Sequence, residues 1–389
     1  MQTDIIIIGT GISAKLSALY LNLYGFNVIV FHNQEVNQDK SNLVTFLSSG
    51  SIKFLNKIIG ENQALHNYEV IKQLCCVHHN QLDKDNFQFN FDNNKEDLLG
   101  KIIPNNKISE LLDQLIHSNE NINIISNELI DHLKHHHNHL EIITKSTSSI
   151  SAKLLIVADG KNSMIKSYAD FNFITHDFEQ TALSITAKVD RKSQNIAYQY
   201  FTSEGPLALL PYSTSHSSVV WSLKKHSQIL NLSEKKLQDE INNILGSKVS
   251  GFEIVNFQTF NLSFSFAKKL FSKRIAITGD TAHSIHPIAG QGLNLIIKDI
   301  DCLTKQLIKY KSLGYDLGDS IALNEYNKLR KSDNVAYSFG TIILDEIFSI
   351  ENKYVRKLTN SVLKSFNQSE RLKRFFVDSA TGYNNFKNL

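Results

Sequence analysis

The chain has 389 residues, of which 42% are hydrophobic and 20% are charged, and this composition excludes a disordered or coiled-coil protein. Lys and Arg number 41 against 38 Asp and Glu, a balance too even to indicate a nucleic-acid partner. The three cysteines, Cys75, Cys76 and Cys302, form no C-x-x-C pair. Their spacing excludes a disulfide framework or a cysteine zinc site and is typical of a reducing compartment.

The first 32 residues predict a β-α-β unit. The run Ile5–Ile8 is apolar and β-branched, as in a buried parallel strand. Leu16, Leu19, Tyr20 and Leu23 then recur at helical spacing, Gly25 ends the helix, and 28–31 forms a second strand.

A G-x-G-x-x-A motif joins the first strand to this helix. Gly9 allows the tight turn, Gly11 lets a diphosphate approach the backbone, and Ala14 permits close packing of helix on strand. The diphosphate would lie on the free N–H groups of the helix start. On its own the motif leaves an ordinary strand-to-helix turn as the alternative, and His32 stands where a ribose-binding carboxylate is expected.

The middle of the chain is expected to be rich in β-strands. Amphipathic helices are predicted near 51–65 and 108–117, and short strands over 122–157, with a histidine-rich turn at 135–139. From 181 to 266 alternating strands dominate, with one helix among them. The strands are predicted at 183–189, 197–201, 207–210 and 219–223, and the helix at 233–245.

Two further segments carry polar residues at strand ends. The strand 154–157 leads into Ala158-Asp159-Gly160, although Asp-Gly alone is a common turn. The strand 274–278 leads into the loop GDTAHSIHPIAGQGLNL, in which Asp280 suits a sugar or ribityl hydroxyl. Gly290 to Gly292 open a helix whose bare N–H groups favour a developing negative charge. Beyond Gln291 the chain is expected to be helical to its end.

Together these segments resemble the FAD-dependent aromatic hydroxylases, and most of all those of ubiquinone biosynthesis. The phrases "GDTAHSIHPIAGQGLNL", "ADGKNS" and "GPLALLPYSTSHSSVVWSL" are similar to that family's flavin-loop, Asp-Gly and substrate-domain signatures. The resemblance implies an α/β fold. A glutathione-reductase-like, Rossmann-type FAD-binding domain would be interrupted by an antiparallel β-sheet substrate domain and followed by C-terminal helices. The expected ranges are 1–75, 101–170 and 271–345 for FAD, 76–100 and 171–270 for substrate, and 346–389 for a helical end.

The resemblance also implies an activity. A monooxygenase of this family uses NAD(P)H to reduce FAD, and O₂ then gives a flavin C4a-hydroperoxide that hydroxylates the ring of a polyprenylated phenol. Two alternatives stay open: a non-catalytic FAD-binding or scaffold subunit of a ubiquinone-biosynthesis complex, and a flavin-dependent prenyl reductase. The related flavin halogenases have a W-x-W-x-I-P pattern, which needs two tryptophans. This chain has one tryptophan, Trp221, which argues against that family.

The family's cofactor contacts carry over onto named positions. Gly9, Gly11 and Ala14 with their neighbours would hold the ADP half of FAD, Asp159 and Gly160 would flank its diphosphate, and Asp280 would bind the ribityl chain. Pro287 and the backbone following it would line the flavin ring. The full expected set is Gly9, Gly11, Ile12, Ser13, Ala14, Asp159, Gly160, Asp280, Pro287, Gly290, Gln291, Gly292, Leu293 and Asn294. No catalytic base is identified, and no metal is expected.

Three positions depart from the family pattern. His32 replaces the ribose carboxylate, and Leu43 and Asn106 stand where arginines are usual. These departures predict weaker FAD binding within an unchanged fold. An imidazole still offers a hydrogen bond to a hydroxyl.

Other conspicuous residues favour structural interpretations. His283 and His286 are expected to order their loop rather than to act as bases, His135–His139 to form a solvated turn, and Trp221 to lie in the core. Leu207, Leu209 and Leu210 are expected to line the substrate pocket.

The expected partners are the polyprenylated phenol, O₂ and other ubiquinone-biosynthesis proteins. No apolar run approaches the roughly 18 residues of a membrane-spanning helix, and the N-terminus lacks a signal peptide's pattern. We therefore expect a cytoplasmic protein. The basic residues Lys364, Arg371, Lys373 and Arg374 suggest a solvated helix face or, alternatively, peripheral contact with the inner membrane.

Overall fold

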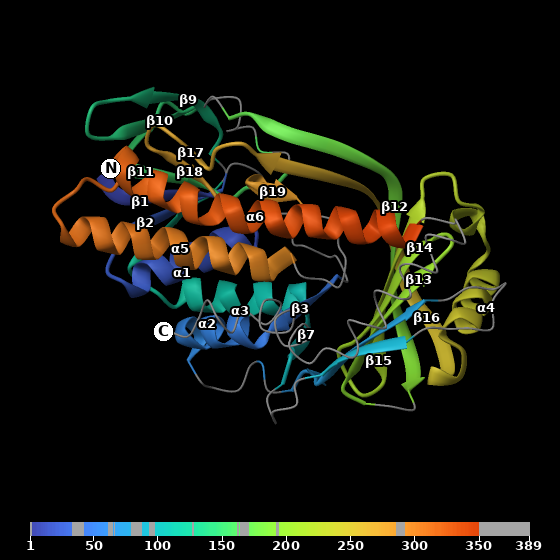
Figure 1. Cartoon of the computed structure of the whole chain (residues 1–389). Coiled ribbons are helices and arrows are strands. Elements are labelled where there is room, and N and C mark those ends of the chain that lie inside the picture. Colours follow the sequence, from blue (N-terminus) through green and yellow to red (C-terminus); the bar gives the residue numbers. More distant parts are fainter. Residues whose placement is uncertain are drawn as a thin grey trace.

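Three β-sheets form the core of the computed structural model (Figure 1). Two of them have eight strands and the third has three. The structure describes residues 2–32, 43–60, 65, 67–78, 88–92, 98–126, 128–161, 163, 171–191, 194–284 and 292–349.

The first sheet has a parallel centre in the order β18-β11-β1-β2-β8. Its antiparallel additions are β17, which pairs with β18, and β10, which joins β11 to β9. Ile5, Ile6, Ile7 and Ile8 of the predicted strand are fully buried, because helices cover a parallel sheet on its faces. The strands are β1 Gln2–Ile8, β2 Val28–Phe31, β8 Ile122–Ile125, β9 Ile130–His135, β10 Leu140–Thr144, β11 Ser149–Val157, β17 Phe271–Ser272 and β18 Ile275–Ile277.

Among the described residues, five helices belong to this part of the molecule. The first, α1, contacts both α3 and α5, and α5 in turn contacts α6. In Figure 1, α6 runs from the first sheet towards the second, and it also contacts β13 and β14 there. The helices are α1 Ile12–Leu23, α2 Ser49–Ile59, α3 Asn105–His117, α5 Gly292–Ser312 and α6 Ser320–Ser349.

The second sheet has the order β19-β16-β12-β15-β14-β13-β5-β6 and is antiparallel except between β13 and β5. Helix α4 (Glu234–Leu245) packs on one of its faces, where Trp221 lies in the core as predicted. The strands are β5 Gln73–His78, β6 Gln88–Asp92, β12 Phe173–Arg191, β13 Ile196–Thr202, β14 Gly205–Pro211, β15 His216–Lys224, β16 Val249–Ala267 and β19 His283–Ser284.

The third sheet, β3-β7-β4, packs against the other face of the second sheet. Val44, Ile71 and Ile102 from this small sheet form one apolar cluster with Ala208 and Leu210 of β14. Its strands are β3 Val44–Ser48, β4 Val70–Ile71 and β7 Gly100–Pro104. The described residues also include three short 3-10 helices: η2 Gln228–Asn231, η3 Gly246–Lys248 and η4 Gly279–Thr281.

Several elements have different bounds in the structure from those predicted. The strand predicted at 183–189 is the 19-residue β12, which pairs along most of its length with the equally long β16. The helix predicted to reach Leu65 ends at Ile59, where Gly60 has a φ of 75°. No helix within the described residues is long and apolar enough to span a membrane.

Candidate functional site

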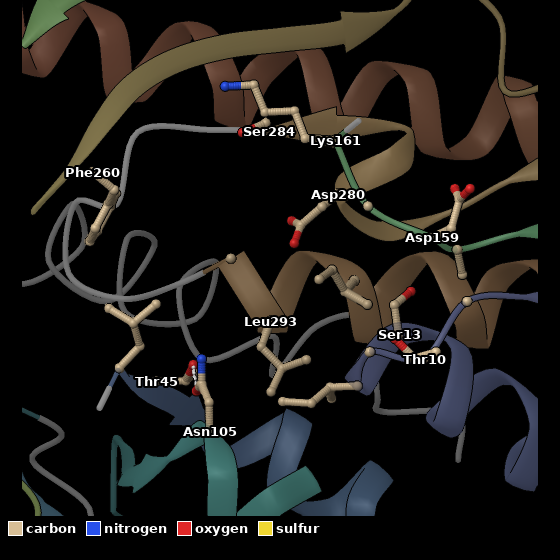
Figure 2. Close-up of a pocket in the computed structure, with 18 of the residues that line it drawn as sticks. Thr10, Ser13, Thr45, Asn105, Asp159, Lys161, Phe260, Asp280, Ser284 and Leu293 are labelled. Carbon is tan, nitrogen blue, oxygen red and sulfur yellow. Dashed lines mark hydrogen bonds between the residues drawn. The ribbon is translucent and has the colours of Figure 1, made fainter. Parts of the chain in front are cut away.

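A cavity of about 680 Å³ opens between the first and second sheets (Figure 2). Figure 2 shows Thr10 and Ser13 on one side of it, Phe260 on the opposite side and Asp280 between them. Its volume lies within the roughly 300–1,000 Å³ of cofactor and ligand pockets. The lining includes Gly9, Thr10, Gly11, Ile12, Ser13, Leu43, Val44, Thr45, Asn105, Asp159, Gly160, Lys161, Leu210, Val220, Phe260, Asn261, Leu262, Ser263, Asp280, Ser284, Gly292, Leu293 and Ile296.

The glycine turn after β1 forms one wall of the cavity. Gly9 has a φ of 141°, and a Cβ there would lie 2.3 Å from the carbonyl oxygen of Ala158, so only glycine fits. A Cβ on Gly11 would meet nothing within 4 Å. Gly11 is the N-cap of α1 and offers no side-chain cap, so the first N–H groups of the helix lack a side-chain acceptor. The turn therefore offers room and donors to an anion.

A serine hydroxyl beside this turn is also available to bind an anion. Ser13 lines the cavity, and its buried Oγ has no hydrogen-bond partner among the described residues. A buried hydroxyl without a partner is costly, so a ligand oxygen is the natural complement. Ala14 is fully buried behind the lining, where it packs close to Gly9. These residues fit the diphosphate of a dinucleotide such as FAD.

The Asp-Gly turn lies next to the glycine turn because β11 pairs in parallel with β1. The N–H of Gly160 donates to Thr281 Oγ1 at 2.9 Å, and Thr281 Oγ1 donates to Asp159 Oδ1 at 3.4 Å. Thr281 belongs to η4, so the second and third sequence motifs are joined by hydrogen bonds. The chain folds three separate motifs into one site.

Asp280 projects from η4 into the cavity, above Leu293 of α5 (Figure 2). Gly292, Leu293 and Ile296 supply the wall from the first turns of α5. Asn294 points elsewhere: its Oδ1 accepts from the N–H of Ser48 at 2.9 Å, and its Nδ2 donates to the carbonyl of Phe46 at 2.7 Å. Its side chain thus fixes α5 to β3. Of the remaining predicted residues, Pro287, Gly290 and Gln291 lie outside the described residues.

A buried polar network holds this loop from behind. Asp299 of α5, which is fully buried, accepts hydrogen bonds from His283 Nε2 and, at 2.7 Å, from Arg330 Nε. Burial alone would raise the pKa of Asp299, but His283 and Arg330 outweigh it and hold that pKa at about 2. Asn334 donates to the same carboxylate at 3.3 Å. His283 therefore orders the loop and lies outside the cavity lining, whereas His286 is outside the described residues.

The three residues that depart from the family pattern, His32, Leu43 and Asn106, lie at different places around the site. His32 Nδ1 lies 3.3 Å from Ser126 Oγ at the adjacent ends of β2 and β8. Burial, followed by the charge of Lys15, lowers the pKa of His32 below its usual range. Leu43 lines the cavity directly, and the buried Asn106 Oδ1 has no hydrogen-bond partner among the described residues.

One prediction for the substrate side is wrong in part. Leu210 lines the cavity, but Leu207 and Leu209 point to the opposite face of β14, where they pack in the core beneath α4. Successive residues of a strand alternate between faces, so all three leucines cannot share one pocket. Val220 and Phe260, which were not predicted, complete the apolar lining with Leu210.

The histidine-rich turn lies away from this cavity and does not contribute to its lining. His136 and His139 stack with ring centroids 4.2 Å apart in the exposed hairpin between β9 and β10, as expected of a solvated turn. The basic group Lys364, Arg371, Lys373 and Arg374 lies outside the described residues.

Comparison with known proteins points to the same chemistry. A family model described as an FAD binding domain matches residues 2–330. The chain is 26% identical over 392 residues to the 3-demethoxyubiquinol 3-hydroxylase of Escherichia coli K12, covering 98% of each chain. It is 30% identical over 237 residues to the ubiquinone hydroxylase UbiL of Rhodospirillum rubrum, covering 60% of this chain and 55% of that protein.

Solved structures share the fold. The p-nitrophenol 4-monooxygenase PnpA of Pseudomonas putida DLL-E4 is similar with a TM-score of 0.78 at 14% identity, covering 98% of both chains. PqsL of Pseudomonas aeruginosa, a probable FAD-dependent monooxygenase, has a TM-score of 0.76 at 18% identity and covers 90% of this chain and 97% of its own. At these identities the likeness shows the fold alone.

Proposed function

This chain belongs to the family of FAD-binding-domain proteins, and from that premise we propose that it hydroxylates the ring of a polyprenylated phenol in ubiquinone biosynthesis. It is an FAD-dependent monooxygenase that uses NAD(P)H and O₂. The observation that carries the proposal is the cavity itself, in which the three dinucleotide motifs meet an apolar wall of the second sheet. The full-length likeness to the Escherichia coli hydroxylase supports the choice of substrate.

The cofactor contacts follow from the geometry of the cavity. The N–H groups at the start of α1 and the hydroxyl of Ser13 would receive the diphosphate, with Gly9, Gly11, Ile12 and Ala14 shaping the turn. Asp159 and Gly160 would flank the diphosphate. When bound, FAD supplies the redox chemistry that activates O₂ for transfer to the substrate.

The protein's own residues would orient the flavin and the substrate. Asp280, which lines the cavity, would accept hydrogen bonds from the ribityl hydroxyls. The backbone of the first turn of α5, at Gly292, Leu293 and Asn294, would contact the flavin ring, and Pro287, Gly290 and Gln291 belong to the same proposed set. The N-terminus of a helix favours negative charge, so the start of α5 would favour negative charge on a flavin ring held there.

The opposite wall suits an aromatic substrate. Leu210, Val220 and Phe260 present an apolar surface from the second sheet to the flavin side. A prenylated ring gains free energy from burial there, at about 25 cal/mol per Å² of apolar surface. A small charged acid would gain far less, which favours the phenol as substrate.

The domain division is proposed with the function. Residues 1–75, 101–170 and 271–345 would bind FAD, while 76–100 and 171–270 would form the substrate domain and 346–389 a helical end. Separate first and second sheets support this division, although β5 already begins at Gln73 within the second sheet. Contacts with other ubiquinone-biosynthesis proteins and with a membrane surface belong to the same proposal.

The test is a reconstituted reaction. Purified protein should show a flavin absorbance spectrum, and with NAD(P)H and a prenylphenol it should insert one atom of ¹⁸O from ¹⁸O₂ into the ring, as measured by mass spectrometry. A scaffold subunit would consume no NAD(P)H in response to substrate. A prenyl reductase would add hydrogen to the tail and leave the ring without ¹⁸O, and either result would contradict the proposal.

A further inference from the structure

Two polar side chains line the cavity where the third sheet meets the start of α3, and neither is among the predicted cofactor residues. Thr45 lies on β3, and Asn105 is the first residue of α3. The hydroxyl of Thr45 donates a hydrogen bond to Asn105 Oδ1 at 2.6 Å, and Figure 2 shows the two side chains next to one another. They form one polar corner of the cavity, which we call the Thr45–Asn105 pair.

The surrounding backbone holds this pair in a fixed place. Strand β3 pairs with β7, which leads directly into α3, and the N–H of Asn105 donates to the carbonyl of Leu43 at 2.9 Å. Asn294 of α5 donates to the carbonyl of Phe46, the residue that follows Thr45. The Thr45–Asn105 pair is therefore fixed beside the first turn of α5.

The hydrogen bond within the pair decides which part of the Asn105 amide is left for a ligand. An asparagine side chain has one oxygen, which accepts hydrogen bonds, and one NH₂ group, which donates them. Thr45 already donates to Oδ1, and the side chain of Asn105 points into the cavity (Figure 2). The group that remains for a ligand is the Nδ2 amide, so the pair is complementary to a hydrogen-bond acceptor.

The position of the pair indicates which acceptor it meets. In the proposed function the flavin ring lies against the first turn of α5, and Leu293 of that turn lines the cavity next to the pair (Figure 2). The pyrimidine ring of a flavin carries two carbonyl oxygens, whereas its dimethylbenzene ring carries no acceptor. Hydrogen bonds to the ring system are one of the means by which a protein tunes a flavin.

We propose that Asn105 is a flavin-binding residue that donates a hydrogen bond from Nδ2 to a carbonyl oxygen of the flavin's pyrimidine ring, and that Thr45 is a positioning residue that holds the amide in this orientation. The inference rests on the proposed function, because it takes the first turn of α5 as the place of the flavin ring. Reduction makes the ring richer in electrons. A donor at its carbonyl therefore binds reduced FAD more tightly than oxidised FAD and raises the midpoint potential.

The experiment measures the dissociation constant of FAD by titration of the apo-protein and the midpoint potential of the bound FAD against a reference dye. Asn105→Asp keeps the shape of the side chain and the acceptor for Thr45 but replaces the N–H donors with an oxygen. FAD should bind about tenfold more weakly or worse. The affinity for reduced relative to oxidised FAD should fall by about tenfold, which lowers the potential by about 30 mV for two electrons. A carboxylate in the first turn of a helix is favourable, so the melting temperature of the apo-protein should not fall.

Thr45 is tested through the amide that it holds. Thr45→Val keeps the shape of the side chain but removes the hydroxyl, so the amide of Asn105 is free to turn. FAD should bind about 2- to 10-fold more weakly, and the potential should fall in the same direction. Thr45→Ser keeps the hydroxyl and should show values near those of the wild type. A lower melting temperature of the Thr45→Val apo-protein with an unchanged potential would mean that Thr45 is structural only.

Asn261 of β16 provides a matched control on the second sheet. It also lines the cavity, and its Oδ1 also accepts a hydrogen bond from a threonine hydroxyl, that of Thr181 at 3.4 Å. Asn261→Asp adds the same charge to the same cavity at an exposed position, where salt screens it. It should change the affinity for FAD and the ratio of the two affinities by less than about threefold. Equal effects of Asn105→Asp and Asn261→Asp would be effects of charge alone and would overturn the inference.

Failure of the inference is distinguishable from failure of the proposed function. If the wild-type protein hydroxylates prenylphenols while Asn105→Asp keeps the potential of bound FAD, only the inference is overturned. If Asn105→Asp weakens FAD and lowers the potential as expected but the wild-type protein hydroxylates no prenylphenol, the proposed function fails and the flavin contact stands.

Discussion

Gly9 is required by the fold of the turn, whereas Gly11 leaves room for a ligand, and this difference provides a test of FAD binding. A Cβ on Gly11 meets only open space, so Gly11→Val should fold normally while its side chain occupies the room for the diphosphate. We expect the purified variant to lack flavin absorbance and to keep the melting temperature of the wild-type apo-protein. Flavin at wild-type stoichiometry would refute the assignment.

Gly9→Val is the informative contrast at the same turn. Its Cβ would lie 2.3 Å from the carbonyl oxygen of Ala158, and its φ of 141° is unfavourable for any side chain. This variant should lose thermal stability even as apo-protein, whereas Gly11→Val should not. Equal melting temperatures for the two variants would contradict the distinction.

Asp280 gives the second prediction at this scale. Its carboxylate points into the cavity, and a hydrogen bond to a charged group is worth about 1.5–3 kcal/mol. Asp280→Ala should therefore weaken FAD by about 10- to 100-fold. A fluorescence titration of the apo-protein measures the dissociation constant, with Asp319→Ala on the surface turn before α6 as control. An unchanged constant would exclude the ribityl contact.

His32 tests the departure from the family pattern. A carboxylate at the end of β2 accepts bonds from two ribose hydroxyls, whereas the imidazole of His32 already faces Ser126. Protein purified without added FAD should therefore be partly apo, and His32→Glu should lower the dissociation constant of FAD. Weaker binding by this variant would mean that the strand end does not face the ribose.

At the scale of elements, the network around Asp299 joins β19, α5 and α6. One side of α6 carries polar residues at every fourth position: Tyr326, Arg330 and Asn334. Tyr326 donates a hydrogen bond to the carbonyl of Ile277. Arg330 and Asn334 donate to Asp299, which also accepts from His283. Removing one partner from a buried ion pair costs about 3–5 kcal/mol because a charge is left uncompensated. Arg330→Met should lower the free energy of unfolding of the apo-protein by about that amount, as measured by urea denaturation.

The matched control is the exposed pair between Lys328 and Glu325 on the same helix. Lys328→Met removes a surface ion pair of 3.0 Å, and such pairs are worth about 0–1 kcal/mol. A loss for Arg330→Met no larger than for Lys328→Met would show that the buried network contributes little.

The same network predicts a loss of stability in acid. The pKa of Asp299 is about 2 in the folded protein, below its ordinary value of 3.8, so the folded state favours the ionised form. The resulting stabilisation, of about 2 kcal/mol, is fully present above roughly pH 4 and is lost as the pH falls towards 2. Asp299→Asn should show a smaller loss of unfolding free energy over this range than the wild type, as measured in urea at each pH.

Element types were predictable from the sequence because they depend on local patterns. The apolar run Ile5–Ile8, the helical spacing after it and the turn glycines each act within a few residues. Strand alternation separates Leu207 and Leu209 from Leu210, but the seven residues of β14 are all buried, so the apolar pattern does not show which of its two faces lines the cavity. Pairing partners such as Asp299 and Arg330 lie 31 residues apart and carry no local signal.

At the scale of the whole molecule, the cavity depends on how two sheets meet. The 19-residue β16 pairs with β12 along the second sheet and also with β19, which follows η4 and the third sequence motif. Phe260 of β16 and Asp280 of η4 therefore face the same cavity although 20 residues separate them in the chain. The sequence motifs predicted the cofactor side of this cavity, whereas the substrate side required the register of the second sheet.

The proposed function of this cavity predicts the phenotype of a strain that lacks the gene. If the cavity couples FAD to a prenylphenol ring, a strain without the gene should accumulate an under-hydroxylated prenylphenol and lose ubiquinone, provided that no second hydroxylase acts at the same position. Lipid extracts analysed by mass spectrometry measure both compounds. The wild-type gene should restore ubiquinone and the Gly11→Val gene should not, because that variant retains the fold but loses the diphosphate site. Restoration by the flavin-free variant would mean that the protein supports the pathway as a scaffold, without catalysis.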